Sequence, residues 1–354
     1  MRMNVLLWAT VALASSCSMD NGSWQEEEPH VPATSLPDAS ASGDSIIKNG
    51  HFTAGSTVRE VIHDVAFDDF GRLLFPVHRS VPEEMTLAQV STSSVYIFYT
   101  NIKVEKTVEI LNYLREESLA GRQIFYRFYS DEEIAANPAR ANTGLFFFRG
   151  EADAPFAITN AGGAFAYVGA MHDSFPHSLE IARSGCNAFA LIYRPDTPYE
   201  DLARAIAYIH DHATELGVTP DGYSLWGGSA GARMAATLGN SDYLRQLTVR
   251  TDIPQASAVI MQYTGYSVVS GQDAPTYACV GTNDGIASWR TMQNRLKHLS
   301  NLGIPTEFHA YEGLSHGFGI GTETVAEGWV NDALDFWKRN RTDGTNTGIT
   351  NVYE

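Results

Sequence analysis

The sequence has few cysteines, few basic residues and no long hydrophobic run. Only three of its 354 residues are cysteine, which excludes a scaffold held together by disulfides. Lysine and arginine together number 24 against 41 acidic residues, so the formal net charge is −17 at pH 7. Nucleic acid and anionic membrane surfaces repel a chain this acidic. Neither is therefore expected as a partner.

The apolar run at the N-terminus, residues 5–14, is too short to span a bilayer stably. It follows Arg2 and leads through small residues to Cys17. This order resembles the signal of a bacterial lipoprotein, in which the cysteine is lipidated and becomes the new N-terminus. An ordinary signal peptide is the alternative, because Ala14 stands where the lipoprotein pattern usually has the leucine found at Leu13. Residues 1–17 thus predict an exported protein that meets a membrane only through a lipid anchor.

Composition divides the rest of the chain into further parts. Residues 18–50 are rich in Ser, Pro, Asp, Glu and Ala, which predicts a disordered, solvated tether. Residues 51–121 hold short apolar segments at helical spacing, and Gly121 is placed as a helix stop. We expect an N-terminal cap there, with padding on the flank of the main domain as the alternative. Residues 122–340 form the expected catalytic domain, and 341–354 a loose polar tail.

From residue 122 onward, apolar runs alternate with helical patterns, which predicts an α/β fold with a doubly wound, mostly parallel sheet flanked by helices. The segments at 145–148 and 156–158 look close enough to pair as a hairpin. Cys186 and Cys279 lie at or in such runs, so free, buried thiols are expected, with a disulfide as the alternative. The strands are expected at 124–129, 145–148, 156–158, 188–193, 223–226, 258–261, 277–280 and 307–311.

A Gly-x-Ser-x-Gly motif carries the strongest chemical signal. Ser229 stands between Gly227-Gly228 and Gly231, directly after one expected strand and at the start of a helix. A serine on such a turn is held in a strained backbone with its hydroxyl exposed, and small neighbours let the turn pack closely. The position predicts that Ser229 is a catalytic nucleophile.

A serine nucleophile needs a base, and in the fold that carries this motif the acid follows the serine along the chain and the histidine follows the acid. Asp284 ends the loop after the strand at 277–280, and His316 follows the strand at 307–311 among small residues. We therefore predict a catalytic triad of Ser229, Asp284 and His316. Asp284 would hold the imidazole tautomer and stabilise the imidazolium.

A glycine pair follows the strand at 156–158 and predicts an oxyanion hole. Backbone N–H groups on such a turn can point at a developing negative charge. The expected donors are Gly163 and Ala164 from this loop and Ala230, the residue after the nucleophile. A plain glycine-rich turn is the alternative.

Together these motifs resemble the esterase branch of the α/β-hydrolases, which includes hormone-sensitive-lipase-like carboxylesterases and bacterial acetyl-xylan and feruloyl esterase-like proteins. The resemblance covers about residues 122–338. It implies the fold, the triad, the oxyanion loop and an ester hydrolysis without a cofactor. The segments that carry it are 161–165, 187–194, 200–205, 227–231, 281–284 and 315–318.

The chain departs from this branch at the oxyanion loop. Ala161 stands where His or Pro is usual, and Ala164 replaces the third glycine. The methyl group of Ala164 crowds the pocket, and a positive φ there would be strained. With Phe165 as a wall, we expect short acyl chains to be preferred. His172 and Asp173 either line this pocket or cap the next helix.

Two other functions stay open. A serine peptidase would use the same triad, but it needs an acidic anchor for the substrate's amino terminus, for which only Glu132 and Glu133 are candidates. A surface-anchored carbohydrate-binding protein on an inactive scaffold is the other. No metal site is expected, because His210 and His212 face different sides of one helix. The expected partner is a small-molecule or carbohydrate ester, and the oligomeric state is not indicated.

Overall fold

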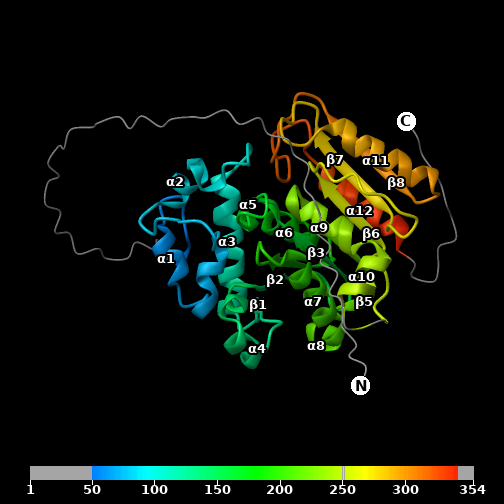
Figure 1. Cartoon of the computed structure of the whole chain (residues 1–354). Coiled ribbons are helices and arrows are strands. Elements are labelled where there is room, and N and C mark those ends of the chain that lie inside the picture. The colour runs from blue at the N-terminus through cyan, green and yellow to red at the C-terminus, as the bar shows by residue number, and fades with distance from the viewer. Residues whose placement is uncertain (1–49, 249, 251, 342–354) are drawn as a thin grey trace, which may run out of the picture. The chain divides into compact units, whose positions relative to one another are not determined.

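The computed structural model describes residues 50–341 except 249 and 251. The expected export signal, Cys17, the tether up to residue 49 and the tail from 342 lie outside this part of the chain. Figure 1 shows the described chain as one sheet with helices around it, and a group of N-terminal helices beside it.

Eight strands form one sheet in the order β1-β2-β4-β3-β5-β6-β7-β8. β1 and β2 run antiparallel to their neighbours, and every pair from β4 to β8 is parallel. This is the mostly parallel sheet that the sequence predicts. The strands are β1 Phe125–Tyr126, β2 Gly144–Phe148, β3 Pro155–Asn160, β4 Asn187–Ile192, β5 Thr219–Gly228, β6 Ala258–Gln262, β7 Thr276–Gly281 and β8 Thr306–Tyr311.

The hairpin expected between β2 and β3 is wrong, because β4 lies between them. The side chain of Asn187, the first residue of β4, accepts from the N–H of Gly150 and donates to the carbonyls of Glu151 and Ala154. The β2–β3 connection is thereby tied to the start of β4 and does not turn directly back.

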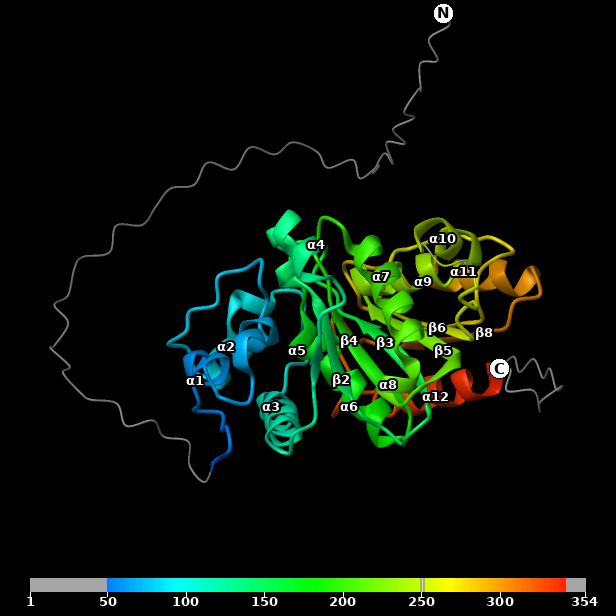
Figure 2. The same cartoon turned by 90° about the horizontal axis from the view of Figure 1, so that it is seen from below.

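Helices cover both faces of the sheet, as a buried parallel sheet requires. α6 and α12 pack on one face, and α7, α9, α10 and α11 lie over the other (Figure 2). These and the neighbouring short helices are α4 Asp131–Ala136, η4 Pro138–Asn142, α5 Ala170–Asp173, α6 Phe175–Arg183, α7 Pro198–Asp211, α8 Ala213–Leu216, α9 Ala230–Leu238, α10 Ser241–Leu247, α11 Trp289–Asn301 and α12 Trp329–Asn340.

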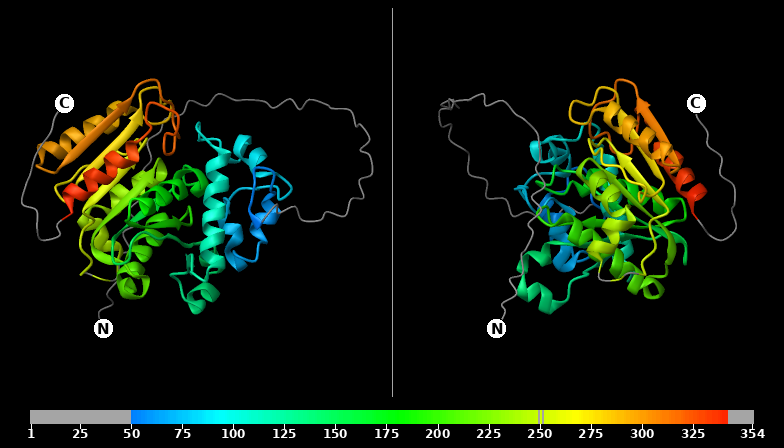
Figure 3. Two further views of the ribbon diagram at one scale, coloured as in Figure 1. Left: turned by 180° about the vertical axis from the view of Figure 1, so that it is seen from behind. Right: turned by 45° about the vertical axis from the view of Figure 1, so that its right-hand side comes forward.

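The N-terminal cap is helical and lies beside the sheet domain (Figure 3). Its α3 packs against α6. Its first two α-helices begin with capping boxes. The side chains of Thr57 and Thr86 accept from the N–H groups of Glu60 and Gln89, whose side chains in turn accept from the N–H groups of the two threonines. Gly121 follows the last helix with φ +80°, as its predicted role of helix stop requires. The helices are α1 Val58–Ile62, η2 Asp68–Leu74, α2 Leu87–Thr92, η3 Ser94–Tyr96 and α3 Val104–Leu119.

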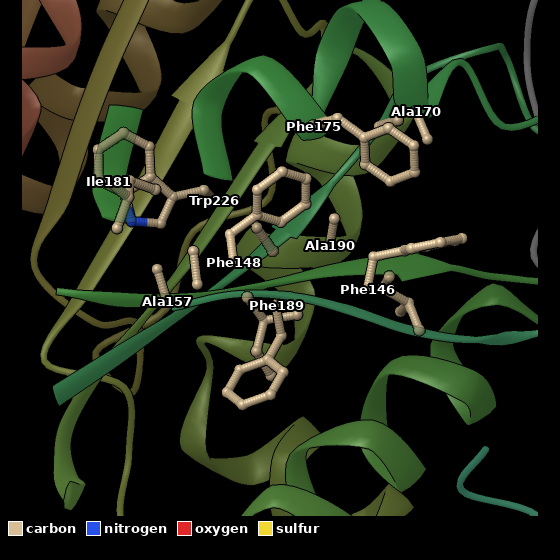
Figure 4. Packing of buried hydrophobic residues seen from close by; sticks show 14 of the residues in the cluster. Phe146, Phe148, Ala157, Ala170, Phe175, Ile181, Phe189, Ala190 and Trp226 are labelled. Carbon is tan, nitrogen blue, oxygen red and sulfur yellow. The ribbon is translucent and has the colours of Figure 1, made fainter. Parts of the chain in front are cut away.

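Alternating side chains of β2 build both halves of the core. Phe146 and Phe148 point to the face covered by α6, where both rings meet Phe175 at centroid distances of 4.9 and 5.7 Å (Figure 4). Phe147 points to the opposite face and stacks on Phe189 of β4 at 4.2 Å. The sheet is therefore buried on both sides.

Cys186 and Cys279 are free and buried, as predicted. Within the described residues, no helix is long and apolar enough to cross a membrane.

Candidate active site

Ser229 lies on the sharp turn between β5 and α9. Its φ is +52°, a region that residues with a side chain rarely adopt, and its ψ is −113°. Its N–H donates to the carbonyl of Gln262 at the end of β6, at 3.0 Å. This turn places the serine at the carboxyl end of the central parallel strands, where ligands bind in open α/β sheets.

The glycines around Ser229 are required by space. A Cβ on Gly227 would lie 2.2 Å from the backbone of Gly231, and one on Gly231 would lie 1.9 Å from the carbonyl oxygen of Asn160. A Cβ on Gly228 would lie 2.4 Å from both carboxylate oxygens of Asp173. The predicted motif therefore corresponds to a close contact of the turn with β3 and with the helix that follows.

The structure brings Ser229, His316 and Asp284 together in one chain of hydrogen bonds. The Oγ of Ser229 lies 3.2 Å from Nε2 of His316, and Nδ1 of His316 lies 2.7 Å from Oδ2 of Asp284. A carboxylate can only accept, so Nδ1 carries the ring proton and Nε2 is left to accept from the serine hydroxyl. This is the protonation state in which a histidine can act as a base.

Asp284 is held from the other side by its own loop. Its Oδ1 accepts from the backbone N–H groups of Ile286 and Ala287, each at 2.8 Å. Its side chain is fully buried, and that of His316 is 7% exposed. The buried, fully bonded carboxylate gives the imidazole a fixed partner.

The glycine-rich loop after β3 passes beside Ser229. A Cβ on Gly162 would lie 2.9 Å from the Cβ of Ser229. Gly163, Ala164 and Phe165 all have positive φ, at +130°, +56° and +57°. Ala164 thus has the strained backbone that the sequence led us to consider.

Among the described residues, the backbone N–H groups of Gly163, Ala164 and Ala230 donate to no other residue. The N–H of Gly162, in contrast, is taken by the carboxylate of Asp173 at 2.6 Å. Three unused donors therefore remain on the loop and at the start of α9.

Asp173 lies inside the protein, behind the loop. It also accepts from the hydroxyl groups of Tyr99, at 3.2 Å, and of Tyr263. Burial raises the pKa of Asp173 to about 6, and the hydrogen bonds from Tyr263, Gly162 and Tyr99 oppose this rise. Asp173 is 2% exposed and holds the loop through its hydrogen bond with the N–H of Gly162.

His172 and Phe165, the two other residues considered for the pocket, contact different aromatic side chains. The ring of His172 meets that of Tyr96 in the N-terminal cap edge-on, with a centroid distance of 4.2 Å, and burial lowers the pKa of His172 to about 3. Phe165 is half-buried against Tyr193 and Tyr199, with centroid distances of 6.3 and 6.2 Å. His172 therefore packs against the cap, whereas Phe165, in the loop itself, packs against Tyr193 and Tyr199.

Sequence reasoning missed Tyr99, Thr100 and Tyr263. Tyr263 follows β6 directly, and its ring lies 4.8 Å from that of His316, so its place at a strand end was a usable signal. The hydroxyl of Thr100 donates to the carbonyl of His316 at 2.7 Å, across 216 positions of sequence. No local pattern marks such a contact.

In the described part of the chain, no three side chains of His, Cys, Asp or Glu gather as a metal site would require. The histidines considered in the sequence are both engaged locally: His210 bonds the carbonyl of Ile206, and His212 bonds Glu215.

No protein-family model matches the sequence, and no curated protein matches it. Solved structures do. An acetyl ester-xyloside bifunctional hydrolase from Caldicellulosiruptor lactoaceticus matches 60% of this chain and 95% of its own, at 18% identity and a TM-score of 0.51. Esterase 2 of Thermogutta terrifontis, phosphorylated by paraoxon, matches 61% of this chain and 94% of its own, at 19% identity and a TM-score of 0.51. The propionate-bound form of the same esterase matches 60% of this chain and 91% of its own, at 19% identity and a TM-score of 0.51. Likeness at this level of identity shows the fold, and the chain has the α/β-hydrolase fold.

Proposed function

We propose that the protein is a serine hydrolase of carboxylic esters that works through an acyl-enzyme. The observation that carries this proposal is the hydrogen-bond chain from Ser229 through His316 to Asp284, with Ser229 at positive φ on the turn after β5. Ester hydrolysis needs no other group than a nucleophile, a base and oxyanion donors. In this proposal Ser229 is the nucleophile, His316 is the base, and unused backbone N–H groups are the oxyanion donors.

In the first half of the reaction, Nε2 of His316 takes the proton of the Ser229 hydroxyl while Oγ attacks the ester carbonyl carbon. The carbonyl oxygen becomes an oxyanion, and Asp284 stabilises the imidazolium. The tetrahedral intermediate then collapses: the bond to the alcohol oxygen breaks, and His316 gives its proton to the leaving alcohol.

In the second half, His316 takes a proton from water, whose oxygen attacks the acyl carbon. Collapse breaks the bond to Oγ, the proton returns to the serine, and the acid leaves. We assign the oxyanion hole to the unused N–H groups of Gly163, Ala164 and Ala230. Removing one such donor typically costs about 100- to 1,000-fold in rate in serine hydrolases.

For the substrate we propose a short acyl ester, with acetyl or feruloyl groups on plant polysaccharide as candidates. This choice rests on the exposed methyl group of Ala164 and the half-buried ring of Phe165, which we expect to restrict the acyl chain beside the loop. Two structural neighbours fit this choice: one is an acetyl ester-xyloside hydrolase, and the other is an esterase with propionate bound.

The peptidase alternative named Glu132 and Glu133 as candidate anchors for a peptide amino terminus, and the described contacts engage one of them, Glu133. Glu133 closes the capping box of α4 with Ser130 and pairs with Arg204 at 2.9 Å. A peptide amino terminus would therefore have to displace Arg204 from Glu133, which favours the esterase proposal.

The proposal is tested with a fluorophosphonate probe followed by a panel of acetyl, butyryl and feruloyl esters. Ser229→Ala should abolish labelling and lower turnover by several orders of magnitude. Ser184→Ala, an exposed serine at the end of α6, is the matched control and should behave as wild type. An unlabelled wild type would favour a binding protein, and a Ser229→Ala variant with more than about a tenth of the wild-type rate would refute the site.

A further inference from the structure

A short segment of the N-terminal cap contacts both sides of the candidate active site. This segment, residues 98–101, is called here the clamp segment and joins η3 to α3. On one side it meets the loop that carries His316, and on the other it meets Asp173 beneath the oxyanion loop. Nothing in the proposed reaction itself requires these contacts.

The clamp segment is bonded directly to the histidine loop. The N–H of Thr100 donates to the carbonyl of Gly317 at 3.1 Å, and its hydroxyl donates to the carbonyl of His316 itself at 2.7 Å. Gly317 has φ +71°, and a Cβ there would lie 2.1 Å from the carbonyl oxygen of Phe98. The loop and the clamp segment therefore touch backbone to backbone, directly beside the histidine.

The same segment is bonded to the support of the oxyanion loop. The hydroxyl of Tyr99 donates to Oδ2 of Asp173, the same oxygen that accepts from the N–H of Gly162. Burial holds the pKa of the Tyr99 hydroxyl well above its usual value, so this group keeps its proton and donates. A Cβ on Gly169 would lie 2.3 Å from the Tyr99 oxygen, which shows how closely the ring is enclosed.

Other contacts hold the histidine loop further along. The side chain of Gln262 and the indole of Trp329 both donate to the carbonyl of Gly319, at 2.8 and 3.1 Å. Those bonds lie three residues beyond His316. The clamp segment contacts residues 316 and 317, so it alone among these supports bonds the backbone of the histidine.

We propose that the clamp segment positions the catalytic machinery. The Thr100 hydroxyl fixes the backbone position of His316, and the Tyr99 hydroxyl fixes the position of the oxyanion loop through Asp173. This inference rests on the proposed function. The N-terminal cap then acts as a fixed part of the active site, and Tyr99 and Thr100 are positioning residues that touch no substrate.

The experiment compares two substitutions that keep shape and backbone contacts, Tyr99→Phe and Thr100→Val. Loss of a contact that matters for the reacting geometry lowers kcat and kcat/KM together and leaves KM nearly unchanged. We expect each variant to lose about tenfold in kcat and the double variant about 100-fold, the scale of a misplacement of about 1 Å. Thr100→Ser keeps the hydroxyl and should restore the wild-type rate.

The matched controls are Tyr113→Phe and Thr92→Val, which make the same changes in α3 and α2. Tyr113 stacks on Phe148 and the exposed Thr92 bonds only its own helix. Both should keep the wild-type kcat. Melting temperatures of all variants distinguish a positioning role from a purely structural one. A purely structural role would lower the melting temperature and leave kcat unchanged in the folded protein.

The outcomes distinguish this inference from the proposed function. A wild type that neither reacts with the fluorophosphonate probe nor turns over esters refutes the proposed function and the inference with it. An active wild type whose Tyr99→Phe and Thr100→Val variants match the controls in kcat refutes the inference alone. Loss of rate in Thr100→Ser equal to that in Thr100→Val also overturns the role given to the hydroxyl.

Discussion

Replacing Asp284 by asparagine should separate catalysis from folding. The carbonyl oxygen of asparagine can take over the two bonds from the N–H groups of Ile286 and Ala287, which Oδ1 now accepts at 2.8 Å. The amide NH₂ then faces Nδ1 of His316, where Oδ2 now lies at 2.7 Å. An amide nitrogen only donates, so the ring must accept at Nδ1 and carry its proton on Nε2. Ser229 loses its base.

The expected loss is large for activity and small for stability. The wrong tautomer costs about 10⁴-fold in kcat, which corresponds to about 5.5 kcal/mol in the barrier. Exchange of one hydrogen bond for another of the same shape changes the free energy of unfolding by about 1 kcal/mol. The loop geometry is retained, because its two N–H groups stay bonded.

The assay measures kcat with saturating p-nitrophenyl acetate alongside a urea unfolding curve. Asp284→Ala is the control: it removes the base's partner and also orphans two N–H groups, so activity and stability should both fall. An Asp284→Asn variant within about tenfold of the wild-type kcat would contradict the reasoning, since it would show that His316 keeps its working tautomer without the carboxylate.

Three further outcomes are expected. Ala164→Gly relieves the left-handed strain and removes the methyl group, so kcat/KM should rise for longer esters in an acetyl, butyryl and decanoyl series; a wild type that prefers the decanoyl ester would refute the small pocket. If Cys17 is lipidated, the wild type should partition into detergent and Cys17→Ala should not; equal partitioning would refute the lipoprotein hypothesis. The pKa of His172 is lowered to about 3, so its contribution to stability is present above pH 6.5 and is lost as the pH falls below it. Urea unfolding of His172→Gln should therefore depend less on pH between about 6 and 4, by about 1.4 kcal/mol per pH unit, and an unchanged slope would refute the burial argument.

The parts of the fold that sequence predicted well are those with local causes. The turn at Ser229 is marked by nearby glycines, because the backbone of Gly227 and Gly231 must meet closely there. Asp284 and His316 each follow a fully or partly apolar strand, and parallel strands bring their carboxyl ends to one edge. Order along the chain was therefore enough to find three side chains that lie far apart in sequence.

The parts that sequence did not predict depend on pairing between distant segments. β4 enters between β2 and β3, and nothing in the short connection at 149–154 indicates this; the deciding side chain is Asn187, which lies beyond both strands. Asp173 was considered as a pocket residue because it follows the oxyanion loop. Its buried position depends on hydroxyl groups 74 residues before it and 90 residues after it.

The two buried thiols can report local unfolding of the sheet. Cys186 lies just before β4, and Cys279 lies inside β7, and burial raises the pKa of both thiols. A thiol in this state reacts with an alkylating reagent only when the structure around it opens, and different regions of a protein open with different free energies. In a Cys17→Ala chain, mass spectrometry of alkylated peptides would time the opening of the two sites separately. The local stabilities of β4, which follows Cys186, and of β7, which leads to the loop of Asp284, could thus be ranked. No probe would have to be introduced into the protein.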